Sequence, residues 1–240
     1  MAKQVAEGVW NLGAHHFNFY AIEDGGRITL VDAGVRRDWM RLLRGLDEIG
    51  HALGSVEAIV LTHAHIDHVG VAERTRSEAG ARVHVHCDDE PYAAGRERIR
   101  PSSRQRPAFG WTLLKSAFWM LAGGGVRYPA IHELTTFDDG EVIDVPGRPK
   151  VHHTPGHTPG SVSFQIPSRD LLFTGDALVT RSMVTGRQAP MSGLNIDAEQ
   201  ARESLRVIER LDAKILLPGH GPPWLDGTRA AVALALEGSD

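Results

Sequence analysis

Three histidines and one aspartate stand within six consecutive positions of this chain. The cluster runs from His63 through His65 and Asp67 to His68, and one residue separates it from the apolar stretch 56–61. Imidazole nitrogens and carboxylate oxygens are the ligands that suit zinc and its first-row neighbours. A cluster placed where a strand ends can meet side chains from other strands at the edge of a sheet. The motif therefore predicts a metal site, with a histidine-rich loop without metal as the alternative.

Three further candidate ligands stand alone in the second half of the chain. They are His157, Asp176 and His220, and each follows a stretch with the composition of a strand. A glycine directly precedes each of them, and glycine permits tight turns and a close approach of the backbone to a bound ion. We therefore expect five histidines and two aspartates to converge on one site.

This ordered set resembles the metallo-β-lactamase superfamily, whose signature is HxHxDH followed by a distant histidine, an aspartate and a last histidine. The resemblance starts at the turn Asp32-Ala33-Gly34 and extends to His220, so it covers nearly the whole chain. It implies the α/β class and a four-layer αβ/βα sandwich. It also implies that residues 1–240 form a single domain, a size that is common for layered folds.

The same resemblance implies two divalent metal ions and their ligands. His63, His65 and His157 would hold the first ion, Asp67, His68 and His220 would hold the second, and Asp176 would bridge the two. Ions about 3.5–4 Å apart can share a water, lower its pKa and supply a bridging hydroxide as the nucleophile. Asp67 would also be catalytic, by accepting a proton as the intermediate breaks down. Zinc is the first candidate metal, and iron and manganese remain alternatives because the same ligands accept them.

Asp32 is the candidate for orienting a ligand histidine by accepting a hydrogen bond from the ring nitrogen that does not bind metal. A ligand imidazole usually donates its second nitrogen to a carboxylate or carbonyl, which fixes its tautomer and direction. A simple turn-forming aspartate before Ala33-Gly34 is the alternative at this position. The remaining histidines match no motif, and among them His15 and His16 are candidates for facing the substrate.

Hydrophobic patterning predicts two similar halves that would carry these motifs. Strands are expected over 17–22, 28–32, 56–61 and 83–85, and again over 142–145, 150–153, 161–166, 171–174 and 214–217. Helices are expected over 37–49, after His68, over 198–211 and over 228–236, because apolar residues recur there at helical spacing. Two sheets packed face to face between helical layers would bring the motif loops to one edge.

The segment 90–129 does not fit this repeat and predicts an insertion with its own helix. Its apolar residues include Trp111, Phe118 and Met120, which is more than a free surface loop usually carries. We therefore expect these apolar residues to pack against another surface. Packing on the body of the domain, a lid or wall over the substrate, and a contact in a homodimer are the three alternatives.

The composition of the chain limits the classes of binding partner and the cell compartment that we expect. The net charge is −4 with both signs interspersed, which argues against a nucleic acid as the main partner. The N-terminal residues lack the apolar core of a signal peptide and no stretch is long enough for a membrane span, so we expect a cytoplasmic protein without a membrane partner. The single cysteine, Cys87, cannot form an internal disulfide, and we expect a buried thiol.

The resemblance also bears on the reaction. A full ligand set that includes Asp176 is similar to glyoxalase II enzymes and acyl-homoserine lactonases, whereas β-lactamases of the resembling subgroup lack that aspartate. Two departures stand against either assignment: the chain ends 20 residues after His220, without the helical domain of glyoxalase II, and Val179 stands where lactonases of the best-known type carry tyrosine. We expect a dinuclear metal-dependent hydrolase of a small ester, lactone or thioester. A mononuclear iron persulfide dioxygenase is the alternative, followed by a phosphodiesterase and a non-catalytic metal-clamped module.

Overall fold

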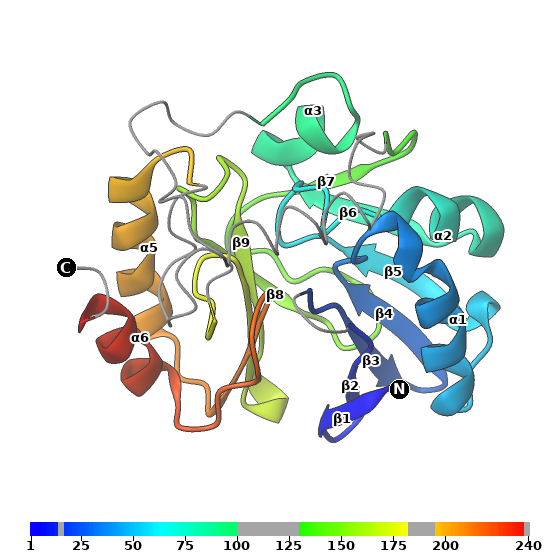
Figure 1. The fold of residues 1–240 in the computed structure, drawn as a ribbon, viewed down its shortest axis with the longest axis horizontal. Coiled ribbons are helices and arrows are strands. Elements are labelled where there is room, and N and C mark those ends of the chain that lie inside the picture. Colours follow the sequence, from blue (N-terminus) through cyan, green and yellow to red (C-terminus); the bar gives the residue numbers. More distant parts are fainter. Residues whose placement is uncertain (14–16, 100–129, 182–194, 238–240) are drawn as a thin grey trace, which may run out of the picture.

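The computed structural model describes residues 1–13, 17–99, 130–181 and 195–237. In this part of the chain two β-sheets lie between helices, with α1 and α2 on one side and α5 and α6 on the other (Figure 1). His15, His16 and most of the expected insertion lie outside the described residues, so the interpretations placed on them stay predictions.

The first sheet has the strand order β1-β2-β3-β4-β5-β6-β7. Its strands are β1 Lys3–Ala6, β2 Val9–Asn11, β3 Tyr20–Asp24, β4 Arg27–Val31, β5 Val56–Val60, β6 Arg82–His86 and β7 Thr135–Phe137. Neighbours from β1 to β4 are antiparallel, and neighbours from β4 to β7 are parallel. The carboxyl ends of β4 to β7 therefore lie at the same edge of the sheet.

The second sheet has the order β11-β10-β9-β8. Its strands are β8 Lys150–His153, β9 Val162–Ile166, β10 Leu171–Gly175 and β11 Ile215–Pro218. β9 runs antiparallel to β8 and β10, while β10 and β11 are parallel. β8, β10 and β11 consequently end at one edge, where the segments containing His157, Asp176 and His220 begin.

The helices lie on the outer faces of the two sheets or in the loops between strands. They are α1 Trp39–Glu48, α2 Ala72–Ala79, α3 Glu90–Ala93, α5 Ala198–Arg210 and α6 Thr228–Glu237, with the short 3₁₀ turns η1 Arg36–Asp38, η2 Leu53–Ser55, η3 Cys87–Asp89 and η4 Pro167–Arg169. α5 starts at an aspartate N-cap, because the Asp197 carboxylate accepts from the backbone N–H groups of Glu199 and Gln200.

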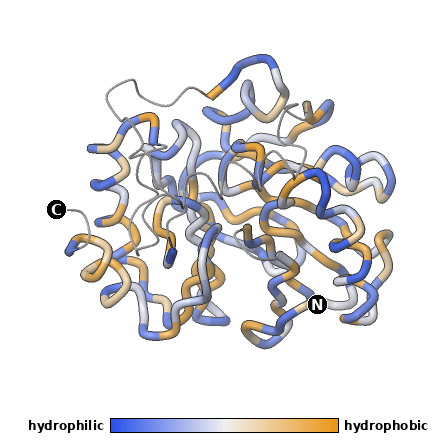
Figure 2. Tube along the Cα trace, in the orientation of Figure 1, coloured by the Kyte–Doolittle hydropathy of each residue, from blue (hydrophilic) through white to orange (hydrophobic). Residues whose placement is uncertain are grey.

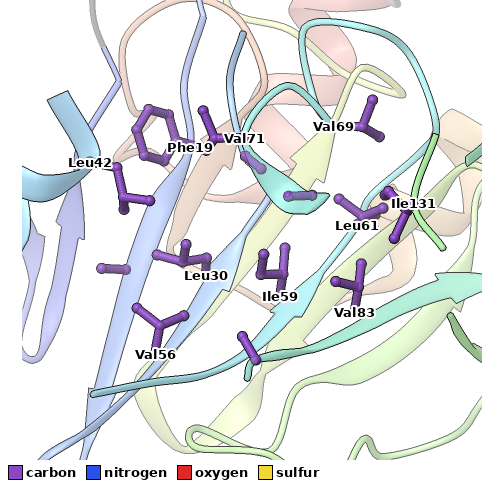
Figure 3. Close-up of a cluster of buried hydrophobic side chains, with 14 of the residues drawn as sticks. Phe19, Leu30, Leu42, Val56, Ile59, Leu61, Val69, Val71, Val83 and Ile131 are labelled. Atoms are coloured by element: carbon purple, nitrogen blue, oxygen red, sulfur yellow. The ribbon is translucent and has the colours of Figure 1, made fainter. Parts of the chain in front are cut away.

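Three apolar clusters separate the layers. In the first, Leu30, Ile59 and Val83 lie side by side on adjacent strands and pack with Leu42 of α1 (Figure 3). Their chain neighbours point the other way, so a second cluster that includes Val31 and Val60 lies between the sheets together with Phe164 and Phe173. A third cluster joins Leu172 and Leu216 to the buried face of α5 and to α6.

The clusters establish a four-layer arrangement of helix, sheet, sheet and helix. This confirms the α/β class and the sandwich that the sequence predicted. Figure 2 shows the corresponding pattern, with hydrophobic positions interleaved with hydrophilic ones along the outer helix α5. Only the faces of these elements that meet another layer need to be apolar.

Several expected boundaries were wrong. The strand expected from residue 17 begins at Tyr20, and the strand expected over 142–145 is reduced to an isolated bridge between Val142 and Lys150. β1, β2 and β7 were not anticipated, so the first sheet is larger than the second and the two halves are less alike than the patterning suggested. Strands of three or four residues carry too few alternating residues to stand out in a sequence.

Cys87 is also corrected by the structure. The thiol is exposed rather than buried, because the residue lies in the turn η3 after β6 and not in the strand.

The two ends of the segment expected as an insertion lie close together. The backbone N–H of Ile131 donates to the carbonyl of Ala93 at 3.0 Å.

Candidate metal centre

The seven residues predicted as ligands come together at the shared edge of the two sheets. Their ligand atoms form three overlapping groups, each with all atoms within 4.8 Å of one another. The first group is His63, His65 and His157, the second group is Asp67, His68 and His220, and a linking group is His63, His68 and Asp176. Six of the seven side chains are buried, and His65 is partly exposed. The first and second groups contain the same residues that the resemblance assigns to the first and second ions.

Asp176 occupies the middle of the cluster. Its Oδ2 lies 3.3 Å from Nε2 of His157 and 3.2 Å from Nε2 of His220, while its Oδ1 lies 3.5 Å from Nε2 of His68. One carboxylate thus reaches a histidine of the first group and two of the second. That is the placement a bridging ligand requires.

Buried polar atoms without hydrogen bonds test whether these residues fit a metal. Nε2 of His63, Nε2 of His68 and Oδ1 of Asp176 are buried and form no hydrogen bond within the described residues. Nδ1 of His65 and Nε2 of His157 lie only 2.8 Å apart, a contact that needs a proton or a cation between two nitrogen lone pairs. Burying such atoms unpaired is costly. A cation between them satisfies all of them, so the side chains fit the metal-binding role.

The protonation of the imidazoles divides the cluster into two halves. Burial lowers the pKa of His63, His65 and His157, and the neighbouring imidazoles lower that of His63 further. Burial also acts to lower the pKa of His68, but the carboxylates of Asp32 and Asp176 outweigh it and raise the pKa to about 10. These shifts favour neutral imidazoles with free lone pairs in the first group, whereas a cation at the second group would compete with a proton.

Asp32 fixes the orientation of His68. Its Oδ2 lies 2.8 Å from Nδ1 of His68 and accepts the hydroxyl of Thr62 at 2.8 Å, and its Oδ1 accepts the backbone N–H of Thr62 at 2.8 Å. The residue has φ of 61°, a left-handed conformation that aspartate tolerates better than most residues. With Nδ1–H donated to this carboxylate, the lone pair of Nε2 faces the cluster.

Asn195 supports His157 in the same way and was missed by sequence reasoning. Its Oδ1 lies 3.0 Å from Nδ1 of His157, and the side chain is buried. The contact spans 38 positions and no motif surrounds the asparagine, so the sequence offered no signal for it.

Asp89 is a second residue that sequence reasoning missed. The fully buried carboxylate accepts the backbone N–H of Ala64 at 2.8 Å, the hydroxyl of Thr158 at 2.8 Å and the backbone N–H of Gly160 at 2.7 Å. It therefore ties the loop that carries His63 and His65 to the loop that carries His157. Burial raises the pKa of this carboxyl even though the three hydrogen bonds act to lower it.

The loop of His220 is held by Asn18, which precedes β3, and by Tyr20, the first residue of β3. Nδ2 of Asn18 donates to the carbonyls of Pro218 at 2.8 Å and Gly221 at 2.7 Å, and the hydroxyl of Tyr20 donates to Pro218 at 2.7 Å. Gly219 is required at the next position: a Cβ there would lie 2.4 Å from Oδ1 of Asp176 and 2.7 Å from Cε1 of His68. The glycine before this candidate ligand thus serves close approach, as the sequence suggested.

The sequence profile of the metallo-beta-lactamase superfamily matches residues 13–220. That range includes the complete ligand cluster described above. The chain belongs to this superfamily.

Individual relatives agree with this membership. The chain is 27% identical over 232 residues to the probable metallo-hydrolase YflN of Bacillus subtilis, covering 92% of this chain and 86% of the relative. It is 31% identical to an uncharacterized protein of Mycobacterium leprae, with 92% and 94% coverage. Together with the metal-binding geometry, these relatives make this superfamily member a metal-dependent hydrolase.

Solved structures share the fold. The subclass B3 metallo-beta-lactamase BJP-1 of Bradyrhizobium japonicum superposes with a TM-score of 0.73 at 17% identity, covering 99% of this chain and 91% of that one. The metallo-beta-lactamase family protein TTHA1429 of Thermus thermophilus gives 0.67 at 25% identity, with 96% and 78% coverage. Among the described residues of this chain, no helix is long and apolar enough to span a membrane.

Proposed function

We propose that this hydrolase cleaves the acyl bond of a small ester, lactone or thioester with two divalent metal ions held by the seven clustered residues. The observation that carries the proposal is the position of Asp176. Its carboxylate lies within 3.5 Å of His157 on one side and of His68 and His220 on the other. A single structural ion would need no carboxylate shared between two histidine groups.

The metal pair, once bound, would activate a water at neutral pH and polarise the acyl oxygen. The chain itself contributes orientation and proton handling. Asp32 and Asn195 hold the far nitrogens of His68 and His157, so both rings present Nε2 to the site. Asp67 is buried with Oδ2 3.5 Å from Nε2 of His220, and we assign it the proton that must move as the tetrahedral intermediate collapses.

Zinc is the metal that we propose for both positions. The cluster offers imidazole and carboxylate ligands only, without a thiolate, and such sets accept zinc, iron and manganese. Two separate groups of three ligands, each sharing Asp176 as the additional ligand, support four-coordinate geometry, which zinc adopts readily.

A small apolar cluster packs beside His220 of the second group. Val179, Phe17 and Val35 form a small buried apolar cluster, and the ring of Phe17 meets the ring of His220 edge-on at 5.6 Å. Val179 is fully buried, so the tyrosine that the best-known lactonases carry at this point could not be accommodated without rearrangement. The proposed reaction therefore does not rely on a hydroxyl from this position.

The test combines metal analysis with a substrate screen on the same sample. Protein purified without added metal is measured by plasma mass spectrometry and then assayed on lactones, thioesters and aryl esters. About two zinc ions per chain with acyl turnover support the proposal. About one iron per chain, no acyl turnover and oxygen uptake with a persulfide would overturn it in favour of a dioxygenase.

Substitution of Asp67 separates a hydrolase from a metal clamp. Asp67→Ala should remove most turnover while the fold is retained, because its carboxylate lies among the ligands. Asp144→Ala is the matched control, since the Asp144 side chain is 91% exposed. Equal turnover in the two variants would contradict the role assigned to Asp67.

A further inference from the structure

A second cluster of metal-binding side chains lies outside the seven-residue centre. His86 is the last residue of β6, and Cys87 and Asp88 follow it in η3. Asp138 follows β7, the neighbour of β6 in the sheet, and His153 ends β8 in the other sheet. The rings of His86 and His153 stack at 4.3 Å with an interplanar angle of 12°. Three strand ends thus bring five potential ligands together.

The distances within two triplets of this cluster, which share His86, suit a bound ion. His86, Cys87 and Asp138 have ligand atoms within 4.8 Å of one another, and so do His86, Asp88 and His153. Sγ of Cys87 lies 3.8 Å from Nδ1 of His86, and that nitrogen lies 3.7 Å from Oδ2 of Asp88. Two ligands of a tetrahedral zinc ion with bonds of about 2.3 Å to sulfur and about 2.1 Å to nitrogen stand about 3.6 Å apart. These two separations are therefore close to those that an ion would impose.

The acidic side chains around this cluster have no lysine or arginine partner among the described residues. Asp88, Asp138, Asp139 and Glu141 all lie in this part of the molecule, and none of them forms an ion pair with a lysine or arginine of the described residues. The thiol of Cys87 donates a hydrogen bond to Oδ1 of Asp138, with 2.9 Å between sulfur and oxygen. This hydrogen bond and the nearby carboxylates raise the pKa of the Cys87 thiol to about 11. A divalent cation would replace that proton and offset the negative charge.

Both histidines keep a nitrogen lone pair available. Nε2 of His153 donates to the carbonyl of Pro159 at 2.8 Å, which leaves Nδ1 of that ring unprotonated. Nδ1 of His86 accepts only the long 3.2 Å hydrogen bond from the backbone N–H of Asp88, besides its contact with the thiol. His86 is buried, so the position of its ring is set by packing rather than by solvent. Because the two rings stack nearly parallel, one of them must turn before both nitrogens can bind the same ion.

We propose that His86, Cys87, Asp138 and His153 form an accessory site for one thiophilic divalent cation such as zinc, with Asp88 as a further oxygen ligand. Binding releases the thiol proton to solvent and forms a metal–thiolate bond, without oxidation or reduction. The affinity should therefore rise with pH. The site is distinct from the centre at His63 to His220 and does not depend on the reaction proposed there.

Cobalt(II) gives a selective test, because a cobalt–thiolate bond has a charge-transfer absorption in the near ultraviolet. Cys87 is the only cysteine of the 240 residues, so this band reports the accessory site and not the histidine-aspartate centre. Titration of the full chain with cobalt should produce the band, and zinc should abolish it. Absence of the band at saturating cobalt would overturn the proposal.

Two variants decide whether the site is built as described. Asp138→Asn and His153→Gln should each weaken cobalt binding at the thiolate at least about tenfold, a loss of about 1.4 kcal/mol. His152→Gln is the matched control, because His152 precedes His153 in β8 but bonds to Gln165 instead. An undiminished band in Asp138→Asn would show that the thiol binds metal without the assembled site. This variant changes an exposed side chain and remains decisive even if His153→Gln fails to fold.

Discussion

Asp89→Asn isolates the contribution of one carboxylate that no ligand motif contains. Oδ2 of Asp89 accepts two hydrogen bonds, from Ala64 and Thr158, and Oδ1 accepts one from Gly160. An asparagine keeps two of the three bonds if its oxygen takes the place of Oδ2. Its NH₂ group then faces the N–H of Gly160, donor against donor, at a separation that is 2.7 Å in the native chain. The side chain has little room to move, because a Cβ on Gly160 would already lie 2.6 Å from the Asp89 backbone nitrogen.

The expected cost follows from the lost bond and the unpaired donor. A hydrogen bond to a charged group contributes about 1.5–3 kcal/mol, and a buried N–H left unsatisfied costs about 1–3 kcal/mol. These terms overlap, so we expect a loss of about 3 kcal/mol in the free energy of unfolding. For a chain of this size that lowers Tm by about 6–12 °C.

Urea unfolding in the presence of a chelator measures this loss without a contribution from bound metal. Asp88→Asn is the matched control: the adjacent aspartate is exposed and should change stability by less than about 0.5 kcal/mol. Because Asp89 joins the loops of His63 and His157, Asp89→Asn should also weaken metal binding at the first group, about tenfold if half of the loss appears there. The reasoning is refuted if Asp89→Asn is as stable as Asp88→Asn.

Three further substitutions probe the cluster and the core. Asp32→Asn replaces the carboxylate that accepts Nδ1–H of His68 with a neutral amide, so metal affinity at the second group should fall by about 10–100-fold. Competition with a chromophoric chelator measures this affinity, and an unchanged value would contradict the orienting role. His157→Ala should lower both the metal content and the thermal stability of the metal-loaded protein, because binding and folding are linked, and an undiminished metal content would rule out His157 as a ligand. Burial and the nearby Arg82 lower the pKa of His84 to about 4, below its unfolded value of about 6.5, so the folded state resists protonation and loses stability as pH falls between those values. His84→Leu should therefore lose less stability than the native chain between pH 7 and pH 4.5 in chelator, as urea unfolding at the two pH values will show, and equal losses would exclude this contribution.

The ligand cluster could be anticipated because each of its motifs is local. His63, His65 and His68 follow directly on a strand, and the glycines before His157, Asp176 and His220 mark tight turns after other strands. Parallel strands end at one edge, so residue type and position after a strand were enough to predict that the seven side chains meet. The alternation of apolar residues in β4 and β5 likewise contained the two faces that the first sheet buries.

Other features depend on contacts between residues far apart in the chain. Asp89 meets Gly160 across 71 positions, and Asn18 meets Pro218 across 200. An isolated aspartate or asparagine has the same appearance in a sequence whether it is solvated in a loop or holds two loops together. The distinction arises only when the sheets pack and remove these groups from water, because burial makes their hydrogen bonds necessary.

Cys87 also separates what the sequence determines from what tertiary structure determines. The sequence determined that this chain has one cysteine and therefore no internal disulfide. We expected a buried thiol at this position, but β6 ends at His86 and the following turn exposes the side chain. Residue types and short spacings determined which chemistry is available to this protein. The packing of one sheet on the other decided which groups are buried, and hence which carboxylates and histidines act together.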